Sequence, residues 1–579
     1  MSLERRSKRI PCNEAARLVR CGARVAIQGS VGGIGEPTAL LRAVRRRFDD
    51  AGEPAGLTLL HATGLGDKRE IGTDLLAVPG LVKRDVAGHL GMAPAMAEMI
   101  RRNQIESFNF PQGVMSQMFG AVAARKPGVF TKVGLGTYID PRLEAGRMND
   151  AARLAAQQDP AGTDYVRVTE IDGHEWLFFP AWHIDVALVR GTTADTNGNV
   201  SSEQEAAVLE GIKIAQAAKS CGGIVIAQVK YLAQAGSIDP RTVRIPGTCV
   251  DYVVVDPLQK QTTLHEYDPA LCGASRMPLD ALAPLPLDHR KVVARRAAAE
   301  LFPGAVVNLG VGMPDGIASV AAERGLLDEL TFTVEQGLIG GRPAGGVIFG
   351  ASYNPQAIIA EDDQFGFYDG GNLDLAFLGM AQCDAEGNVN VSKVGSMLSG
   401  CGGFINISQN AKRVVFCGTM TAKGFSCTAA DGKLRIEREG SIRKFVERVE
   451  QVTFSGRRAR EAGQAVLFVT ERAVFSLRPE GVVLEEVAPG VDIERDVLQQ
   501  MAFRPHVLPD LRQMNPDIFH EAERAANGSA SYGSASHRRD MTTSNGTAPY
   551  GTAPNGTAPN GTAPNGTAAN GQAEVACAR

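Results

Sequence analysis

Short apolar stretches recur along most of the chain, with polar and amphipathic segments between them. Their near-continuous apolar character predicts strands that are buried on both faces, as in parallel sheets. The predicted strands are residues 23–29, 57–64, 185–191, 222–229, 248–256, 305–310, 330–336, 373–380, 413–420 and 464–470. Helical patterns lie between them, for example at 37–48 and 201–220. This alternation predicts an α/β fold with largely parallel sheets.

Two kinds of segment occur twice, in the same order. The pattern D-x-x-G-N-V follows an apolar strand at Asp195 and again at Asp384, and a glycine-rich loop near residue 30 is echoed near residue 310. We therefore predict two related open α/β domains, at 1–275 and 291–524. The proline-rich stretch at 276–290 is predicted to link them.

The last part of the chain has a different composition. After about Arg524 it consists mainly of Asn, Gly, Ser, Thr, Ala and Pro, and N-G-T-A-P repeats with a period of five. Such a segment has few apolar groups to bury, so we predict a disordered tail at 525–579.

Bulk composition narrows the class of protein. The 579 residues are 44% apolar and 21% charged, values typical of globular proteins, and this length predicts two to four domains. A net charge of -4 does not suggest a nucleic-acid surface. The ten cysteines form no C-x-x-C pair, and no histidines accompany them at zinc spacing. Without an apolar secretory segment or a membrane-length apolar run, we expect a cytoplasmic protein that binds neither membrane nor metal.

Glu335 occupies an unusual stretch, "TVEQGLIGGRPAGGVIFG". It is the only acidic residue between 330 and 360, and six glycines lie within 333–350. It ends a predicted strand, and the carboxyl ends of strands form the sites of α/β sheets. Apolar surroundings would desolvate the carboxylate, which favours a nucleophile or a base of raised pKa. A structural alternative stays open, in which the carboxylate only fixes a turn.

Three further loops carry candidate chemistry. Gly310 and Gly312 turn the chain before a helix predicted to begin near Pro314, and such helix starts attract anions. "LSGCGGFINIS" at 398–408 places glycines before a predicted short strand and could present N–H groups to an oxyanion. Gln112, between Pro and Gly, could donate to a substrate carbonyl. For each loop, a plain turn without a ligand is the alternative.

Other enzyme classes lack their motifs. The sequence contains no G-x-S-x-G, which disfavours a standard α/β-hydrolase. It also lacks G-x-x-x-x-G-K-[ST] and H-E-x-x-H.

Together these segments resemble family I CoA-transferases, and most closely the single-chain acetate/propionate CoA-transferases in which two halves are fused. The resemblance spans about residues 10–520. It rests on "GSVGGIGEP", "GLVKRDVAGHLGMAP", "FNFPQGVMSQMF", "KPGVFTKVGLGTYIDPR", "RGTTADTNGNVSSEQEA", "NLGVGMPDGIA", "TVEQGLIGGRPAGGVIFGASYNP" and "SGCGGFINIS". The order E-x-G-x-x-G-G followed by P-x-x-G is fairly specific to this family.

The resemblance implies a role for each candidate residue. Glu335 corresponds to the covalent nucleophile, and Gln112 with the N–H groups of Gly402 and Gly403 to the oxyanion donors. The CoA contacts implied are Asn308, Gly310, Val311, Gly312, Met313 and Lys423, although for Lys423 a plain surface lysine is favoured over a contact with a CoA phosphate. The site would lie between the halves. The family uses CoA and acyl-CoA as substrates and needs no metal or prosthetic group, and its members are often homo-oligomers.

The implied activity is transfer of CoA between a short-chain acyl-CoA and a carboxylic acid such as acetate, propionate, butyrate or acetoacetate. The implied mechanism is ping-pong, through an acyl-glutamyl anhydride and a glutamyl-CoA thioester. Two alternatives remain from the sequence. One is an acyl-CoA hydrolase on the same fold, and the other is an acyl-CoA sensor without catalysis.

Overall fold

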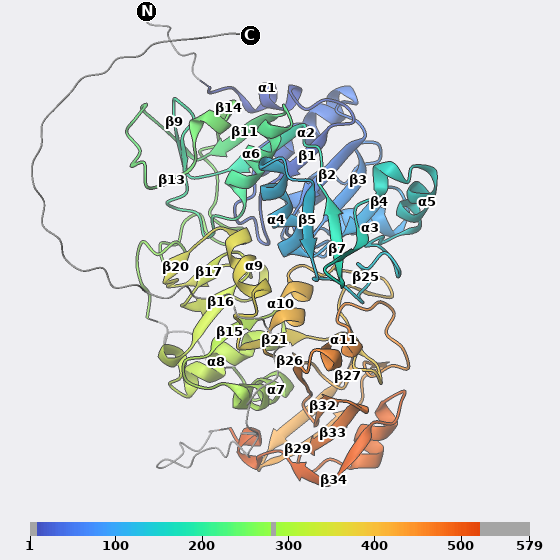
Figure 1. The fold of residues 1–579 in the computed structure, drawn as a ribbon. Coiled ribbons are helices and arrows are strands. Elements are labelled where there is room, and N and C mark those ends of the chain that lie inside the picture. The colour runs from blue at the N-terminus through green and yellow to red at the C-terminus, as the bar shows by residue number, and fades with distance from the viewer. Residues whose placement is uncertain (1–7, 279–284, 522–579) are drawn as a thin grey trace, which may run out of the picture. The chain divides into compact units, whose positions relative to one another are not determined.

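Two separate β-sheets organise the chain. The computed structural model describes residues 8–278 and 285–521, which belong to one compact unit (Figure 1). Each half of the chain contributes one large sheet. The predicted tail at 525–579 and part of the predicted linker, 279–284, lie outside the described residues, and the division into domains at 275 and 291 stays a prediction.

The first sheet is parallel throughout. Strands such as β2 and β8 are buried at every residue, because helices cover the sheet. Helix α1 packs on α2 and α4 packs on α6 around it (Figure 1). In spatial order the strands are β14 (Tyr252–Val255), β11 (Ile224–Val229), β8 (Val186–Arg190), β1 (Arg24–Ile27), β2 (Leu57–His61), β3 (Val82–Ala87) and β4 (Glu106–Asn109).

The second sheet has a parallel centre with antiparallel pairs on both sides of it. Strands β16, β15, β21, β26 and β31 are parallel. Antiparallel pairing continues through β17 and β20 on one side and through β32 and β33 on the other, and β34 pairs parallel with β33. The order is β20 (Ala357–Ile358), β17 (Leu338–Ile339), β16 (Thr331–Val334), β15 (Val306–Leu309), β21 (Leu375–Gly379), β26 (Arg413–Cys417), β31 (Ala465–Val469), β32 (Ala473–Arg478), β33 (Gly481–Val487) and β34 (His506–Gln513).

The helices fill the connections between these strands. In the first half they are α1 (Cys12–Arg17), α2 (Thr38–Ala51), α3 (Pro94–Arg101), α4 (Gln112–Ala123), α5 (Asp150–Gln158) and α6 (Gly211–Ser220). In the second half they are α7 (His289–Ala297), α8 (Gly316–Glu323), α9 (Glu361–Asp369), α10 (Phe404–Asn410) and α11 (Gly456–Glu461). The first half also contains two smaller sheets. One consists of β5 (Gly128–Thr131), β6 (Arg167–Ile171) and β7 (His174–Pro180). The other consists of β9 (Thr193–Asp195), β10 (Val200–Ser201), β12 (Tyr231–Ala233) and β13 (Val243–Ile245).

The fold class is confirmed. Each predicted strand overlaps an observed one, except the short strand predicted within 398–408. The two halves also share a strand order: β2-β1-β8-β11-β14 in the first and β16-β15-β21-β26-β31 in the second. Within the described ranges, no helix has the length and apolar character needed to cross a membrane.

One predicted helix was too long, and one predicted strand was wrong. Residues 201–210 do not continue the helix that follows them, because Leu209 has a φ of 55° and the segment packs its alanines between the halves. Residues 404–408 form the start of α10 rather than a strand. The apolar residues of α10 do not gather on one face of the helix. Ile405 packs into the core of the first half, and Phe404 packs into the core of the second half.

Segment 398–405 joins the halves. Leu90 N–H donates to the Ser399 carbonyl at 2.7 Å, and Gln112 N–H donates to the Gly402 carbonyl at 2.9 Å. Leu398, Cys401 and Ile405 belong to the hydrophobic core of the first half. Backbone hydrogen bonds and apolar burial therefore hold the glycine loop of the second half against the start of α4.

Candidate active site

Glu335 lies at the carboxyl end of β16, as the sequence predicts. Strand β16 ends at Val334, and Gly337, with a φ of 96°, turns the chain so that its N–H donates to the Val334 carbonyl at 3.0 Å. A Cβ at Gly337 would come within 2.2 Å of the Ile359 carbonyl oxygen, so only glycine fits there. The glutamate exposes only 9% of its surface, so its side chain is largely removed from solvent.

Burial is the main influence on the Glu335 carboxyl group. It raises the pKa to about 7, and hydrogen bonds with the side chains of Asn308 and Gln336 act in the opposite direction. Val334 and Leu338, on either side in sequence, pack into an apolar cluster formed by both halves. The groups that favour the charged form are thus amides rather than cations. A carboxylate solvated this poorly is a stronger nucleophile than one in water.

Asn308 supports this carboxylate from the neighbouring strand. It lies on β15, is fully buried, and its amide also donates to the Thr333 carbonyl at 3.3 Å and to the Tyr368 hydroxyl at 3.4 Å. The Tyr368 hydroxyl in turn donates to the Thr333 hydroxyl at 3.0 Å. Asn308 therefore faces the nucleophile and the protein interior. This geometry favours support of Glu335 over the predicted contact with CoA.

Gln112 and the 402–403 loop lie together, as predicted, although they are remote in sequence. Gln112 is the first residue of α4 and is 3% exposed, and its backbone contacts Gly402. The Gly402 N–H, however, donates to the Gly88 carbonyl at 2.7 Å. This occupied donor contradicts the expectation that it stabilises an oxyanion. For Gly403 and the Gln112 side chain, that role stays a prediction.

The predicted CoA loop follows β15. Gly310 N–H donates to the Phe377 carbonyl at 2.7 Å, Gly312 has a φ of 93°, and the Val311 side chain is 56% exposed. The chain then forms a short 3-10 turn, Met313–Asp315, and α8 begins at Gly316, slightly later than predicted. An exposed loop at the carboxyl edge of a parallel sheet is positioned to meet an anionic ligand.

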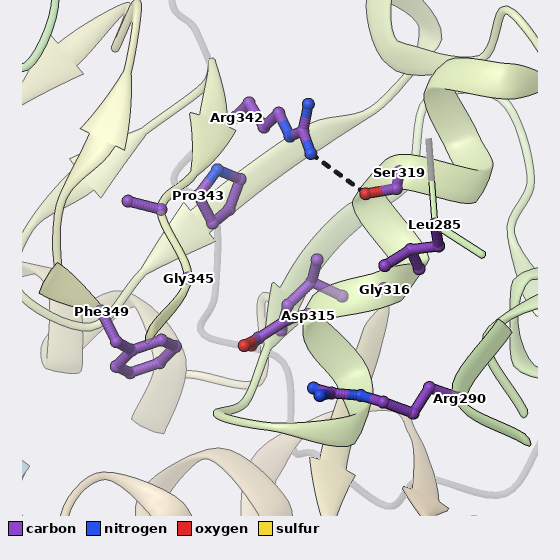
Figure 2. A pocket seen from close by; sticks show the side chains of 11 residues that line it. Leu285, Arg290, Asp315, Gly316, Ser319, Arg342, Pro343, Gly345 and Phe349 are labelled. Carbon is purple, nitrogen blue, oxygen red and sulfur yellow. Dashed lines mark hydrogen bonds between the residues drawn. The ribbon is translucent and has the colours of Figure 1, made fainter. Parts of the chain in front are cut away.

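A cavity of about 200 Å³ lies beside this loop (Figure 2). Two arginines face it, and Arg342 donates to the Ser319 hydroxyl at 3.0 Å across its rim. Burial raises the pKa of Asp315 to about 6. The residues that line the cavity are Leu285, Arg290, Leu309, Asp315, Gly316, Ser319, Arg342, Pro343, Ala344, Gly345 and Phe349.

Lys423 lies elsewhere on the same half. It is exposed, has a φ of 60°, and follows β27 (Thr421–Ala422), outside the lining of this cavity. Its predicted contact with a CoA phosphate stays a prediction.

Comparison with known proteins decides the family. A coenzyme A transferase family model matches residues 11–256. A caffeate CoA-transferase of Acetobacterium woodii is 45% identical over 523 residues, covering 89% of this chain and 98% of the relative. The chain belongs to the coenzyme A transferase family.

Two further relatives support the assignment of this transferase. The acetate CoA-transferase YdiF of Escherichia coli K12 is 40% identical over 516 residues, covering 89% of this chain and 95% of the relative. The crystal structure of the YdiF apoenzyme from Escherichia coli O157:H7 matches with a TM-score of 0.84 at 39% identity, over 90% of this chain and 97% of that one. The resemblance drawn from the sequence is thus confirmed, and CoA is a substrate of the family.

Sequence reasoning missed two buried glutamates of the transferase. Glu361 is the first residue of α9, and Glu210 directly precedes α6. Both are fully buried, and their carboxyl groups lie within hydrogen-bonding distance of each other. The acidic run at 361–363 signals only the start of a helix. Nothing in its spacing indicates that the first member is buried against the other half.

The described part of the transferase contains no group of three or more His, Cys, Asp or Glu side chains arranged to hold a metal ion.

Proposed function

We propose that this transferase moves CoA between a short-chain acyl-CoA and a carboxylic acid, with Glu335 as the covalent nucleophile. The observation that carries the proposal is the Glu335 carboxylate itself. It is buried, its pKa is raised to about 7, and it ends a strand at the carboxyl edge of the sheet. A structural glutamate in a turn would gain stability from a cation or from solvent, and Glu335 has amide partners in an apolar setting.

The proposed cycle has two symmetrical halves. The Glu335 carboxylate attacks the thioester carbonyl, and collapse of the tetrahedral intermediate expels CoA thiolate and leaves an acyl-glutamyl anhydride. The thiolate attacks the glutamyl carbonyl, which gives a glutamyl-CoA thioester and releases the first acid. An acceptor carboxylate then attacks this thioester, and the same steps run backwards. Thioester energy is retained, so the cycle balances without ATP.

Each tetrahedral intermediate carries a negative oxygen that needs hydrogen-bond donors. The candidate donors are the side-chain amide of Gln112, from the first half, and the Gly403 N–H, from the second half. A solved structure of YdiF described as a thioester complex with CoA supports a thioester intermediate in this family member.

For the carboxylic acid substrate we propose a class of compounds rather than a single one. One relative is named for caffeate and another for acetate. One methylene changes discrimination by only about 1–3 kcal/mol in an apolar pocket, so short-chain acids should overlap as substrates. We propose acetate, propionate and butyrate as the acid class and test caffeate beside them.

The deciding experiment is intact-mass measurement after incubation with acetyl-CoA, propionyl-CoA or caffeoyl-CoA, followed by peptide mapping. We expect a CoA-sized, hydroxylamine-labile adduct on Glu335 that disappears when the acceptor acid is added. Hydrolysis without an acceptor acid would favour a hydrolase. Binding of acyl-CoA by folded protein without any adduct or turnover would favour a sensor, and Glu335 would then be a turn residue.

A further inference from the structure

Three helices begin at one point between the halves. Gln112 starts α4, Glu210 directly precedes α6, and Glu361 starts α9. Gln112 and Glu210 come from the first half of the chain, and Glu361 comes from the second. Gln112 is 3% exposed, and the two glutamates are fully buried. Such complete burial of two carboxyl groups demands a compensating interaction, because neither has water around it.

The contacts form a chain across the boundary. The Gln112 amide donates to Glu361 Oε1 at 3.0 Å, and the Glu361 carboxyl group contacts that of Glu210. Both oxygens of Glu210 and the Oε2 of Glu361 have no donor among the described residues. Two touching carboxylates would repel each other in this buried setting, whereas a carboxylic acid can donate to a carboxylate. One proton between them satisfies the geometry.

We propose that Glu210 and Glu361 share one proton across the boundary between the halves and that this pair positions the Gln112 amide at Glu335. The role of Gln112 rests on the proposed function, whereas the shared proton rests on the contacts alone. Both glutamates are positioning residues. They act through Gln112, whose second amide hydrogen is left to meet the substrate carbonyl.

The surrounding charges agree with a proton on the pair. Burial raises the pKa of Glu210 to about 7 and that of Glu361 well above its ordinary range, and the charge of Glu335 adds to the effect on Glu361. Glu210 also faces His61 and Asp362. His61 is paired with Asp85 at 2.9 Å, and Asp362 with Lys213 at 3.5 Å, so these two neighbours are themselves part of ion pairs.

Loss of the shared proton has a defined consequence. At alkaline pH the pair would carry two negative charges, and their repulsion would move Glu361 away from the Gln112 amide. The Gln112 backbone stays bonded to Gly402, but its side chain would lose its orienting partner. We therefore expect turnover to fall on the alkaline side through misalignment, with little change in affinity for acyl-CoA.

The test compares four variants of the full-length protein under steady-state conditions with acetyl-CoA and propionate. In E361L the partner of Gln112 is lost, so kcat should fall about 100-fold, as for a lost oxyanion donor, with a smaller change in KM. E361Q can still accept from Gln112 and donate to Glu210, so its kcat should exceed that of E361L by at least about ten-fold. In E210Q the amide donates without titrating, and the alkaline limb should move up by at least about one pH unit. D363N removes an exposed carboxylate two residues along α9 and should match the wild type.

Infrared spectroscopy gives a second readout that does not depend on turnover. The wild-type protein should show the C=O stretch of a buried carboxylic acid, weakened or lost in both E210Q and E361Q but not in D363N. Absence of that band, or an unchanged pH profile in E210Q together with wild-type kcat in E361L, would overturn the proposal. If the wild type forms no adduct on Glu335, the proposed function fails, and the infrared band still tests the shared proton.

Discussion

The two halves of the molecule share a scaffold and differ at the position where the chemistry is proposed. Five strands run in the same order in each sheet, and in each half a D-x-x-G-N-V turn follows the third of them in chain order. In both turns the aspartate accepts from the backbone two and four residues later, at 3.0 and 2.9 Å for Asp195 and at 3.1 and 3.0 Å for Asp384. The two turns predicted as a repeat therefore share their hydrogen bonds as well as their sequence pattern.

Strand pairing shows where the halves diverge. Ala26 on β1 pairs with Leu60, and Asn308 on β15 pairs with Thr333, each one residue before the end of its strand. The second residue after the partner is Ala62 in the first half and Glu335 in the second. At these two matching positions the first half has Ala26 and Ala62. The second half has Asn308 and Glu335. The first half instead contributes Gln112 and Glu210 from its helices.

Making the second half like the first should abolish transfer. E335A installs the residue found at the matching position, Ala62, and removes the nucleophile. We expect kcat to fall by at least about 10⁴-fold, with no CoA adduct in intact-mass spectra. E329Q, which changes an exposed glutamate shortly before β16, serves as the matched control. Substantial transfer by E335A would remove Glu335 from the mechanism.

The same carboxylate should destabilise the folded protein at neutral and higher pH. Its pKa rises from 4.5 to about 7 on folding, so the contribution of this group to stability is fully present below pH 4.5 and is lost as the pH rises through 7. E335Q lacks this loss and should unfold with a free energy higher by up to about 3 kcal/mol at pH 8, the gain vanishing near pH 4. Chemical denaturation at both pH values measures this. Equal stability of E335Q and wild type at pH 8 would contradict a desolvated carboxylate.

N308A installs the residue of the other matching position, Ala26, and keeps the nucleophile. Loss of the amide hydrogen bond raises the pKa of Glu335 further, so less of it is ionised at neutral pH. The wild-type rate should rise with pH up to about 7 and then level off, until any loss of the proton shared by Glu210 and Glu361 lowers it at alkaline pH. In N308A the first midpoint should move upward, with about ten-fold lower kcat at pH 7 that recovers at higher pH. A uniform loss at every pH would instead indicate structural damage.

The smallest effects should be equal in the two halves. D195A and D384A each remove the acceptor of a buried turn, and each should lower the free energy of unfolding by about 1–3 kcal/mol without moving the pH–rate profile. D239A, at an exposed aspartate, should change stability by less than about 0.5 kcal/mol. A change in the pH–rate profile for D384A alone would show that the second-half turn takes part in the chemistry.

Local patterns were sufficient to predict much of the fold. Buried parallel strands are apolar throughout, so their positions can be predicted without knowing their neighbours, and Glu335 could be singled out because its own stretch lacks other charges. The glycine loop at 310–312 was predicted from the turn that its backbone requires. Strands β32 to β34 at one side of the second sheet were not predicted, because charged residues end or interrupt their apolar runs.

The sequence by itself therefore determined the α/β class, the duplication and the candidate nucleophile, because each depends on neighbours a few residues away. Tertiary structure alone decided three things. It made 404–410 a helix by packing it between two cores, it occupied the Gly402 N–H with the Gly88 carbonyl, and it brought Glu210 against Glu361. In each case the deciding partner comes from the other half of the chain. Burial and hydrogen-bond satisfaction at such contacts depend on three-dimensional packing, which local sequence spacing does not encode.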